Sequence, residues 1–251
     1  MLGFCFSTIG IRYYLELEYT GCMGKSGPKP KGKVKITWSA NFAYALGLIA
    51  SDGCLAGGRH IVLVSKDTEQ LENFMKALAI TVPIGKTASG YNGNIASKVQ
   101  FSDVLFYNFL ETIGLMPRKS KIIGEIQIPA KYFFDFLRGS FDGDGCTYSY
   151  WDPRWKSSFM FYTTFVSASY KHIEWLRDEI HAQLGIRGHL TGDGKRVIFQ
   201  LKYAKADSLK LLRKMYYSKK VLCLSRKRLK IEKMLGIVGE LLVKKSKKLT
   251  R

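Results

Sequence analysis

Two apolar stretches with helical spacing end in the same two residues. Ser39 is a favourable N-cap for the first stretch, FAYALGLIASDG, and the second, AKYFFDFLRGSFDGDG, covers residues 130–145. Both stop at an Asp-Gly pair, with the carboxylates at Asp52 and Asp144. The pattern predicts two related helices, each carrying an aspartate at its C-terminal end.

A hairpin with strand-like alternation follows each of these helices. HIVLVS at residues 60–65 alternates, and SFMFYTTFVS at residues 158–167 is rich in aromatic and β-branched side chains. An amphipathic helix, a second hairpin and a third helix come next in both halves, with N-caps expected at Asp67 or Thr68 and at Ser169. The predicted fold class is α+β, with two pseudo-symmetric αββαββα repeats and an antiparallel sheet in each.

Sequence separations support an internal duplication. Asp52 and Asp144 are 144 − 52 = 92 residues apart, whereas Ser65 and Ser167 are 167 − 65 = 102 apart. One insertion of ten residues accounts for the difference, and it must lie in the hairpin that contains YSYWDPRWK. The predicted organisation is an N-terminal extension and basic linker at 1–36, a first repeat at 37–118, a linker at 119–129, a second repeat at 130–230 and a basic helix or tail at 231–251.

Composition narrows the class of protein. The 251 residues are 46% hydrophobic and contain no long uncharged apolar run, which excludes a transmembrane helix. The five cysteines are odd in number and never paired as CxxC, so they suggest neither a disulfide framework nor a zinc ribbon. The apolar N-terminus lacks the basic residues and cleavage site of a secretory signal. An intracellular location is expected, in the cytoplasm or nucleoid, or in an organelle if the gene is eukaryotic.

The charge balance points to a polyanionic partner. Forty Lys and Arg residues oppose twenty Asp and Glu residues, which gives a net charge of +20. Nucleic acid is the favoured partner. A merely soluble basic protein and an anionic membrane surface are the alternatives, but no Lys-rich amphipathic helix with a broad apolar face dominates the chain.

A glycine interrupts each of the two apolar helices at the same place. Gly47 and Gly139 are the third residues of ALGLIASDG and LRGSFDGDG. A glycine inside a helix costs about 1 kcal/mol relative to alanine, so these positions need a reason, and a close approach of two helix backbones supplies one. We therefore expect Gly47 and Gly139 to lie in an interface between the two helices.

If the helices pack in parallel, Asp52 and Asp144 meet where both helix dipoles are negative. Two carboxylates there repel each other, and a divalent cation removes that cost. Hard oxygen ligands with room for water and phosphate suit Mg²⁺. Taken singly, each Asp-Gly pair is also a common turn with a solvated carboxylate. An EF-hand at Asp142 and Asp144 is excluded, because its sixth position is Thr147 and its twelfth is Pro153.

The two segments ALGLIASDG and LRGSFDGDG resemble the paired signature helices of the LAGLIDADG homing endonucleases, single-chain type. The likeness covers about residues 37–230. It also includes Ser65-Lys66-Asp67, Gly114-Leu115 with Lys119-Ser120, and the Gln200 to Ala204 strand that leads to Met215-Tyr216.

This resemblance implies a monomer with internal pseudo-two-fold symmetry, whose two sheets form a saddle in the major groove of a long, specific double-stranded DNA target. It implies an intron-encoded endonuclease that cuts both strands and leaves short 3′ overhangs. Asp52 and Asp144 would bind Mg²⁺ together with the main-chain carbonyls of Ser51 and Gly143. Mn²⁺ would substitute for Mg²⁺, and Ca²⁺ would support binding without cleavage. Lys202 matches a catalytic lysine position, where the first repeat has Gln100.

Several side chains on the hairpins are candidates to contact DNA, since the major groove admits a two-stranded ribbon. About half of them are expected to be solvated or packed instead. They are Arg59, His60, Lys98, Tyr148, Tyr150, Arg154, Lys156, Tyr162, Thr164 and Arg196. Further along the chain, five cations are candidates to grip phosphates: Lys219, Lys220, Arg226, Lys227 and Arg228.

Two other functions remain open on the same scaffold. One is an RNA maturase, which makes RNA a possible partner, and the other is a sequence-specific DNA-binding protein that does not cut. Both aspartates are present, and this favours cleavage, because a protein that only binds has no use for adjacent carboxylates near phosphate.

Overall fold

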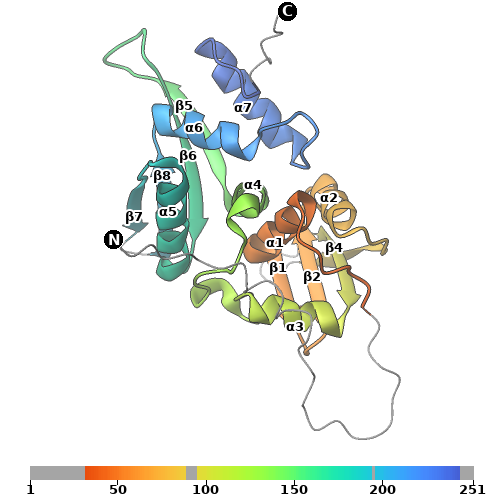
Figure 1. Ribbon diagram of the computed structural model, residues 1–251. Helices are drawn as coiled ribbons and strands as arrows, with labels where there is room; N and C mark the ends of the chain where they lie inside the picture. Colours follow the sequence, from red (N-terminus) through yellow and green to blue (C-terminus); the bar gives the residue numbers. More distant parts are fainter. Residues whose placement is uncertain (1–31, 89–94, 194–195, 244–251) are drawn as a thin grey trace, which may run out of the picture.

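The computed structural model describes residues 32–88, 95–193 and 196–243 and confirms the α+β class (Figure 1). The order αββαββα occurs twice, as predicted. The first repeat consists of α1 (Ala40–Asp52), β1 (Gly53–Ala56), β2 (His60–Ser65), α2 (Thr68–Leu78), β3 (Ile84–Ala88), β4 (Ile95–Ser102) and α3 (Val104–Thr112). The second consists of α4 (Phe133–Asp144), β5 (Cys146–Trp151), β6 (Phe159–Ser167), α5 (Tyr170–Leu184), β7 (His189–Asp193), β8 (Arg196–Tyr203) and α6 (Lys205–Met215).

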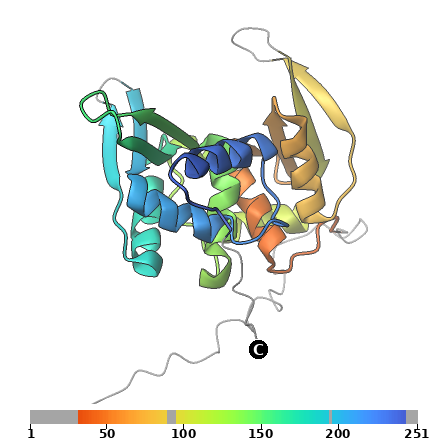
Figure 2. The same ribbon diagram turned by 90° about the horizontal axis from the view of Figure 1, so that it is seen from above.

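Each repeat builds one antiparallel four-stranded sheet, and the two sheets have the same topology. Their strand orders are β1-β2-β4-β3 and β5-β6-β8-β7. Strands β5 and β6 have six and nine residues against four and six in β1 and β2, so the insertion lies in the predicted hairpin. Figure 2 shows the sheets on opposite sides of the central helices α1 and α4.

Helices α1 and α4 touch through their backbones. A Cβ atom on Gly47 would lie 2.1 Å from the Phe136 carbonyl oxygen, and one on Gly139 would lie 2.0 Å from the Tyr44 carbonyl oxygen. One turn further on, a Cβ on Gly143 would lie 2.0 Å from Ser51 Oγ. The contacts follow the same order along both helices, which are therefore parallel, as predicted, with Gly47 and Gly139 in their interface.

The start of α1 also forms as the sequence predicts. Ser39 is the N-cap, and its hydroxyl accepts a hydrogen bond from the Phe42 backbone N–H at 3.1 Å. Helix α4 begins later than residue 130, after a short 3₁₀ turn at Ala130–Tyr132. Asp67 and Ser169 stand at the N-cap positions of α2 and α5, although neither side chain caps its helix.

A buried arginine connects α4 to the chain that follows α6. Arg138 is fully buried and forms an ion pair with Asp135 at 2.8 Å. It also donates hydrogen bonds to the carbonyl oxygens of Met215 at 2.6 Å and Leu222 at 2.9 Å. Since a buried charge is tolerated only when it is paired and hydrogen-bonded, these contacts fix the path of residues 216–224 across α4.

That path leads into α7 (Ser225–Ile237), which returns to the first repeat. The Ser225 backbone N–H donates to Glu69 at 3.1 Å, and Arg226 forms an ion pair with Asp67 at 2.6 Å. Asn73 on α2 donates to the Cys223 carbonyl oxygen at 3.0 Å. Helix α7 therefore ties the two halves together, and the boundary predicted at residue 230 falls inside it.

No helix in the described part of the chain combines the length and the apolarity that crossing a membrane requires.

Alanine at either interface glycine should separate the two central helices. Gly47→Ala or Gly139→Ala places a methyl group on a carbonyl oxygen that belongs to another helix backbone and cannot rotate away. We expect a loss of about 3 kcal/mol in the free energy of unfolding, measured by urea titration. Gly236→Ala in α7 is the control, because a Cβ there meets nothing within 4 Å. It should leave stability unchanged or raise it by up to about 1 kcal/mol, and equal losses at all three positions would contradict the backbone contact.

Candidate functional site

Asp52 and Asp144 are the last residues of α1 and α4, and the structure brings them together. The Asp52 carboxylate lies against α4, because a Cβ built on Gly143 would be only 2.8 Å from Asp52 Oδ2. The chain turns away into β1 and β5 directly after the aspartates. A side chain at Gly53 or Gly145 would collide with the preceding helical turn, and this explains the glycine in both copies.

Both carboxylates have raised pKa values. Loss of hydration between the helix ends is the main cause for each. For Asp144 the negative charge of Asp52 raises the pKa further, because like charges repel. For Asp52 a hydrogen bond from Gln70 Nε2 at 2.7 Å opposes the shift. A cation between these carboxylates would relieve both the repulsion and the lost hydration.

Two lysines cover the C-terminal ends of the same helices. Lys119 is buried and donates to the Gly53 carbonyl oxygen. Lys227 on α7 donates to the carbonyl oxygens of Phe141 at 2.6 Å, Gly145 at 2.7 Å and Gly143 at 3.2 Å. Burial lowers the pKa of both lysines, whereas their positive charges lower the pKa values of Asp52 and Asp144.

Sequence reasoning missed the place of these lysines. The sequence marks Lys119 only as one of the residues that resemble the homing endonuclease family, with no role of its own. It predicts that Lys227, in the C-terminal segment, contacts phosphate. A signal was present, since each lysine follows the third helix of its repeat, α3 or α6. The chain between helix and lysine has no hydrophobic period, so the sequence alone does not say where it returns.

The oxygen atoms at the helix ends fit a hard divalent cation that keeps other ligands. Among the described residues, no group of three or more His, Cys, Asp or Glu side chains could hold a metal by itself. Two carboxylates leave positions for water and phosphate oxygens, as Mg²⁺ prefers. The Gly143 carbonyl already accepts from Lys227. The Ser51 hydroxyl donates inside α1, within 3.2 Å of the Gly47 and Leu48 carbonyl oxygens. Metal binding by the main-chain carbonyls of Ser51 and Gly143 stays a prediction.

Lys202 and Gln100 occupy equivalent places in the two sheets. Lys202 on β8 pairs with Thr164 on β6, and Gln100 on β4 pairs with Val62 on β2. Neither forms a hydrogen bond to an aspartate in the described structure, and Lys119 and Lys227 are the lysines that act on the carboxylates. A catalytic role for Lys202 and Gln100 stays a prediction.

The hairpin residues predicted to contact DNA differ in exposure. Arg59, Tyr148, Tyr150, Arg154 and Lys156 are exposed, and His60, Lys98 and Tyr162 are partly exposed. Thr164 is only 3% exposed. The prediction of a DNA contact by Thr164 is therefore wrong. Arg196 begins β8, but its side chain lies outside the described part of the structure.

Three tyrosines form a cross-strand stack on β5 and β6. The ring centroids of Tyr148 and Tyr162 are 4.9 Å apart, and those of Tyr150 and Tyr162 are 6.2 Å apart, with nearly parallel planes. Beyond them, Arg154 at the hairpin loop pairs with Asp152 at 3.2 Å. This hairpin therefore presents aromatic rings with polar hydroxyl groups and a cation at its end.

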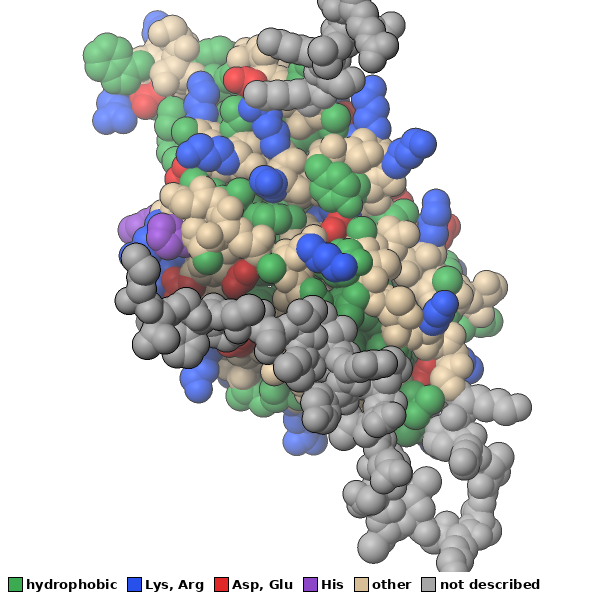
Figure 3. Space-filling view, viewed as in Figure 1, with side chains coloured by type: hydrophobic (Ala, Val, Ile, Leu, Met, Phe, Trp, Pro, Cys, Tyr) green, Lys and Arg blue, Asp and Glu red, His purple; other side chains and the backbone are tan. Residues whose placement is uncertain are grey.

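The cations predicted to grip phosphate are used differently. Lys219 and Lys220 are exposed. Arg226 binds Asp67, Lys227 binds the end of α4, and Arg228 binds Glu232 at 2.9 Å. These three have structural partners within the protein, and a phosphate contact by any of the five cations stays a prediction. On the visible face in Figure 3, Lys and Arg side chains are scattered and do not gather in one patch.

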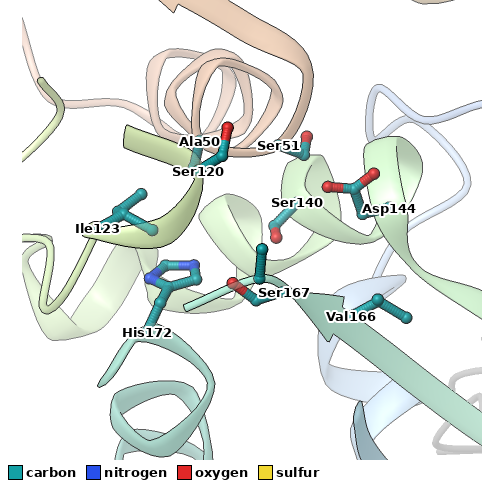
Figure 4. Close-up of a pocket in the computed structure, with 10 residues that line it drawn as sticks. Ala50, Ser51, Ser120, Ile123, Ser140, Asp144, Val166, Ser167 and His172 are labelled. Carbon is teal, nitrogen blue, oxygen red and sulfur yellow. The ribbon is translucent and has the colours of Figure 1, made fainter. Parts of the chain in front are cut away.

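A pocket of about 130 Å³ opens beside Asp144 (Figure 4). Its wall is mostly polar and comes from the ends of α1, α4 and β6, the start of α5 and the segment after α3. The lining residues are Ala50, Ser51, Ser120, Ile123, Ser140, Asp144, Val166, Ser167, Ala168 and His172. His172 is 5% exposed, and its Nδ1 lies 2.8 Å from the Gly124 carbonyl oxygen.

Comparison with known proteins identifies the fold. No protein-family model and no curated protein sequence matches the chain. The homing endonuclease I-WcaI bound to its DNA recognition sequence matches with 15% identity and a TM-score of 0.54, over 82% of this chain and 95% of that one. The I-LtrWI LAGLIDADG homing endonuclease bound to target DNA matches with 11% identity and a TM-score of 0.51, over 79% and 90% of the chains.

Full-length DUF199/WhiA from Thermatoga maritima matches equally well in shape, with 15% identity and a TM-score of 0.51. The match covers 82% of this chain but spans only 62% of the WhiA chain. The arrangement of two four-stranded sheets about a parallel helix pair is thus common to proteins with very different sequences.

Two buried groups near the helix pair should oppose each other in the pH dependence of stability. Burial raises the pKa of Asp142 to about 6 from 3.8 and lowers the pKa of His172 to about 4 from 6.5. Between these values the folded state binds more protons at Asp142, so stability from that group falls as the pH rises. At His172 the unfolded state binds more protons, so stability from that group rises with pH. Each effect is on the order of 3 kcal/mol.

Single substitutions should separate the two contributions. Asp142→Asn retains an oxygen for the hydrogen bonds from Tyr44 and the Leu224 N–H, and this variant should lose stability as the pH falls from 6.5 to 4. His172→Gln should gain stability over the same interval. Urea unfolding at several pH values measures both effects relative to the unmodified protein. Parallel pH profiles for the two variants would contradict the assignment.

Proposed function

Because the chain has the fold of the LAGLIDADG homing endonucleases, we propose that it is a metal-dependent, site-specific DNA endonuclease that acts as a monomer. It would cut both strands of a long duplex target and leave short 3′ overhangs. One observation carries the proposal: two carboxylates with raised pKa values meet at the ends of parallel helices, midway between two sheets of equal topology.

The sheets supply two equivalent surfaces for a duplex with two scissile phosphates. The surface of the second sheet carries the tyrosine stack with Lys202, and that of the first carries Lys98 and Gln100. Hydroxyl, amide and ammonium groups of this kind contact base edges and phosphates. The net charge of +20 adds general affinity for the DNA backbone.

Asp52 and Asp144 would hold the metal ions. A bound Mg²⁺ would activate the attacking water and neutralise charge that develops on the phosphate and on the leaving 3′ oxygen. The protein itself contributes position and charge. Gln70 fixes the orientation of the Asp52 carboxylate, and Lys119 and Lys227 offset the negative helix ends where a phosphate would approach.

The fold alone does not choose between cutting and binding, because WhiA and the homing endonucleases share it. A DNA-binding protein that does not cut, or an RNA maturase, is the second candidate. The paired carboxylates favour cleavage. In a protein that only binds, two carboxylates at a DNA surface would repel the phosphates.

Both aspartates should be needed for cleavage but not for binding. The target is first selected from a randomised duplex library by retention in Ca²⁺, and cleavage of the selected duplex is then started with Mg²⁺. We expect Asp52→Asn and Asp144→Asn to slow cleavage at least about 1,000-fold, a loss near 4 kcal/mol in transition-state stabilisation. Affinity in Ca²⁺ should stay within about threefold. Asp178→Asn, an exposed carboxylate on α5, is the matched control.

If the unmodified protein retains a specific duplex but cuts it in neither Mg²⁺ nor Mn²⁺, the nuclease assignment fails and the binding function stands. Specific retention of RNA in place of DNA would favour the maturase.

The two lysines should affect cleavage more than binding. Lys119→Met and Lys227→Met each remove a positive charge at a helix end while keeping much of the side-chain volume. Loss of one charge-assisted contact near the reacting phosphate should slow single-turnover cleavage about 10- to 100-fold. Lys171→Met on the exposed face of α5 is the control and should cut at the unmodified rate. Unchanged cleavage in both variants would limit these lysines to a structural role.

A further inference from the structure

The Asp52 and Asp144 carboxylates are held in place by different contacts. In the first half, Gln70 Nε2 donates directly to Asp52 Oδ2 at 2.7 Å. The amide is itself held in place, because the Ser65 hydroxyl donates to Gln70 Oε1 at 2.7 Å. A continuous chain of hydrogen bonds from Ser65 through Gln70 therefore fixes Asp52.

The second half has a different residue at the position of Gln70. Gln70 and His172 are 172 − 70 = 102 residues apart, the same separation as Ser65 and Ser167. His172 makes no hydrogen bond to Asp144 or to Ser167 in the described structure. Its Nδ1 is instead bound to the Gly124 carbonyl oxygen at 2.8 Å.

In the second half, both Asp144 and His172 line the pocket described above. Figure 4 shows Asp144 and His172 on opposite sides of this pocket, with Ser140 between them and Ser167 below. About 130 Å³ with several hydroxyl groups in the wall is enough for a few water molecules, each of which takes about 30 Å³ in the liquid. The pocket is therefore polar enough and large enough to hold ordered water.

The tautomer of His172 decides how it can act. A carbonyl oxygen only accepts, so Nδ1 must carry the proton that is donated to Gly124. Burial keeps the ring neutral near pH 7. Nε2 is then an acceptor, and an acceptor cannot bind an ionised carboxylate directly. A water molecule can donate one proton to Nε2 and the other to the carboxylate.

We propose that this pocket is a water site through which His172 positions Asp144, so that the two metal-binding carboxylates are held unequally, one by an amide and one by water. His172 is a positioning residue, because it acts on Asp144 only through the water. The consequence for cleavage rests on the proposed nuclease function. Cleavage of one strand should respond to changes in the pocket, and cleavage of the other should not.

The cleavage experiment replaces His172 by glutamine, the residue at the equivalent position of the first half. His172→Gln should allow a direct hydrogen bond to Asp144 in place of the water. Single-turnover rates are measured separately for the two strands, each 5′-labelled, on the duplex recovered by the selection described above. We expect the rate for one strand to change about 10-fold and the rate for the other to change less than twofold. His181→Gln, the same substitution at an exposed position of α5, should change neither rate.

Equal changes in the cleavage rates of both strands, or no change in either rate, would overturn the proposal that Asp52 and Asp144 are held differently. Affinity in Ca²⁺ and thermal unfolding are recorded for both variants. A change in rate confined to one strand, with affinity and folding retained, is an outcome that a purely structural role of His172 does not produce.

A second experiment does not depend on cleavage. In ¹⁵N NMR spectra of the full-length protein near pH 7, the ring of His172, assigned by its loss in His172→Gln, should show the Nδ1–H tautomer. A crystal structure should show water within hydrogen-bonding distance of both His172 Nε2 and Asp144. The Nε2–H tautomer, or a pocket without ordered water, would overturn the inference. If the unmodified protein cuts neither strand, the proposed function fails, and these two measurements still decide the water site.

Discussion

The contact between the backbones of α1 and α4 determines the geometry on which the rest of the structure depends. With glycine at positions 47 and 139, each helix meets a carbonyl oxygen of the other at a distance that excludes any side chain. Two rigid helices that touch one turn before their ends must bring their last residues together. The carboxylates are therefore neighbours because of packing, and their mutual repulsion is a cost that the helix interface imposes.

Two positive charges at the same end of the helices offset the repulsion between the carboxylates. Lys119 and Lys227 arrive there from segments that follow the third helix of each repeat, and their ammonium groups bind carbonyl oxygens at or just after the helix ends. The buried ion pair of Arg138 sets the route of the second segment. The buried charge of Arg138 in α4 therefore helps to bring the charge of Lys227 to the end of the same helix.

Much of this fold could be predicted from the sequence, because hydrophobic period and repeat spacing are local signals. The helix pair, the two hairpins and the longer second hairpin all follow from them. Contacts made by single polar side chains could not be predicted. Arg138 is a charged side chain but is fully buried, and Lys227 lies in a basic run but binds the end of α4. Thr164 alternates like an exposed strand residue, yet it is buried.

Helix α7 places a condition on the order of events during synthesis. Of the two ammonium groups that cover the central helix ends, the one at α4 comes from Lys227, and the N-terminus of α7 is fixed by Glu69 in the first repeat. A nascent chain that has already folded both repeats still lacks this lysine, because residues 225–237 leave the ribosome after them. The paired carboxylates therefore acquire their full complement of positive charge only when the last helix has emerged and bound back across both halves.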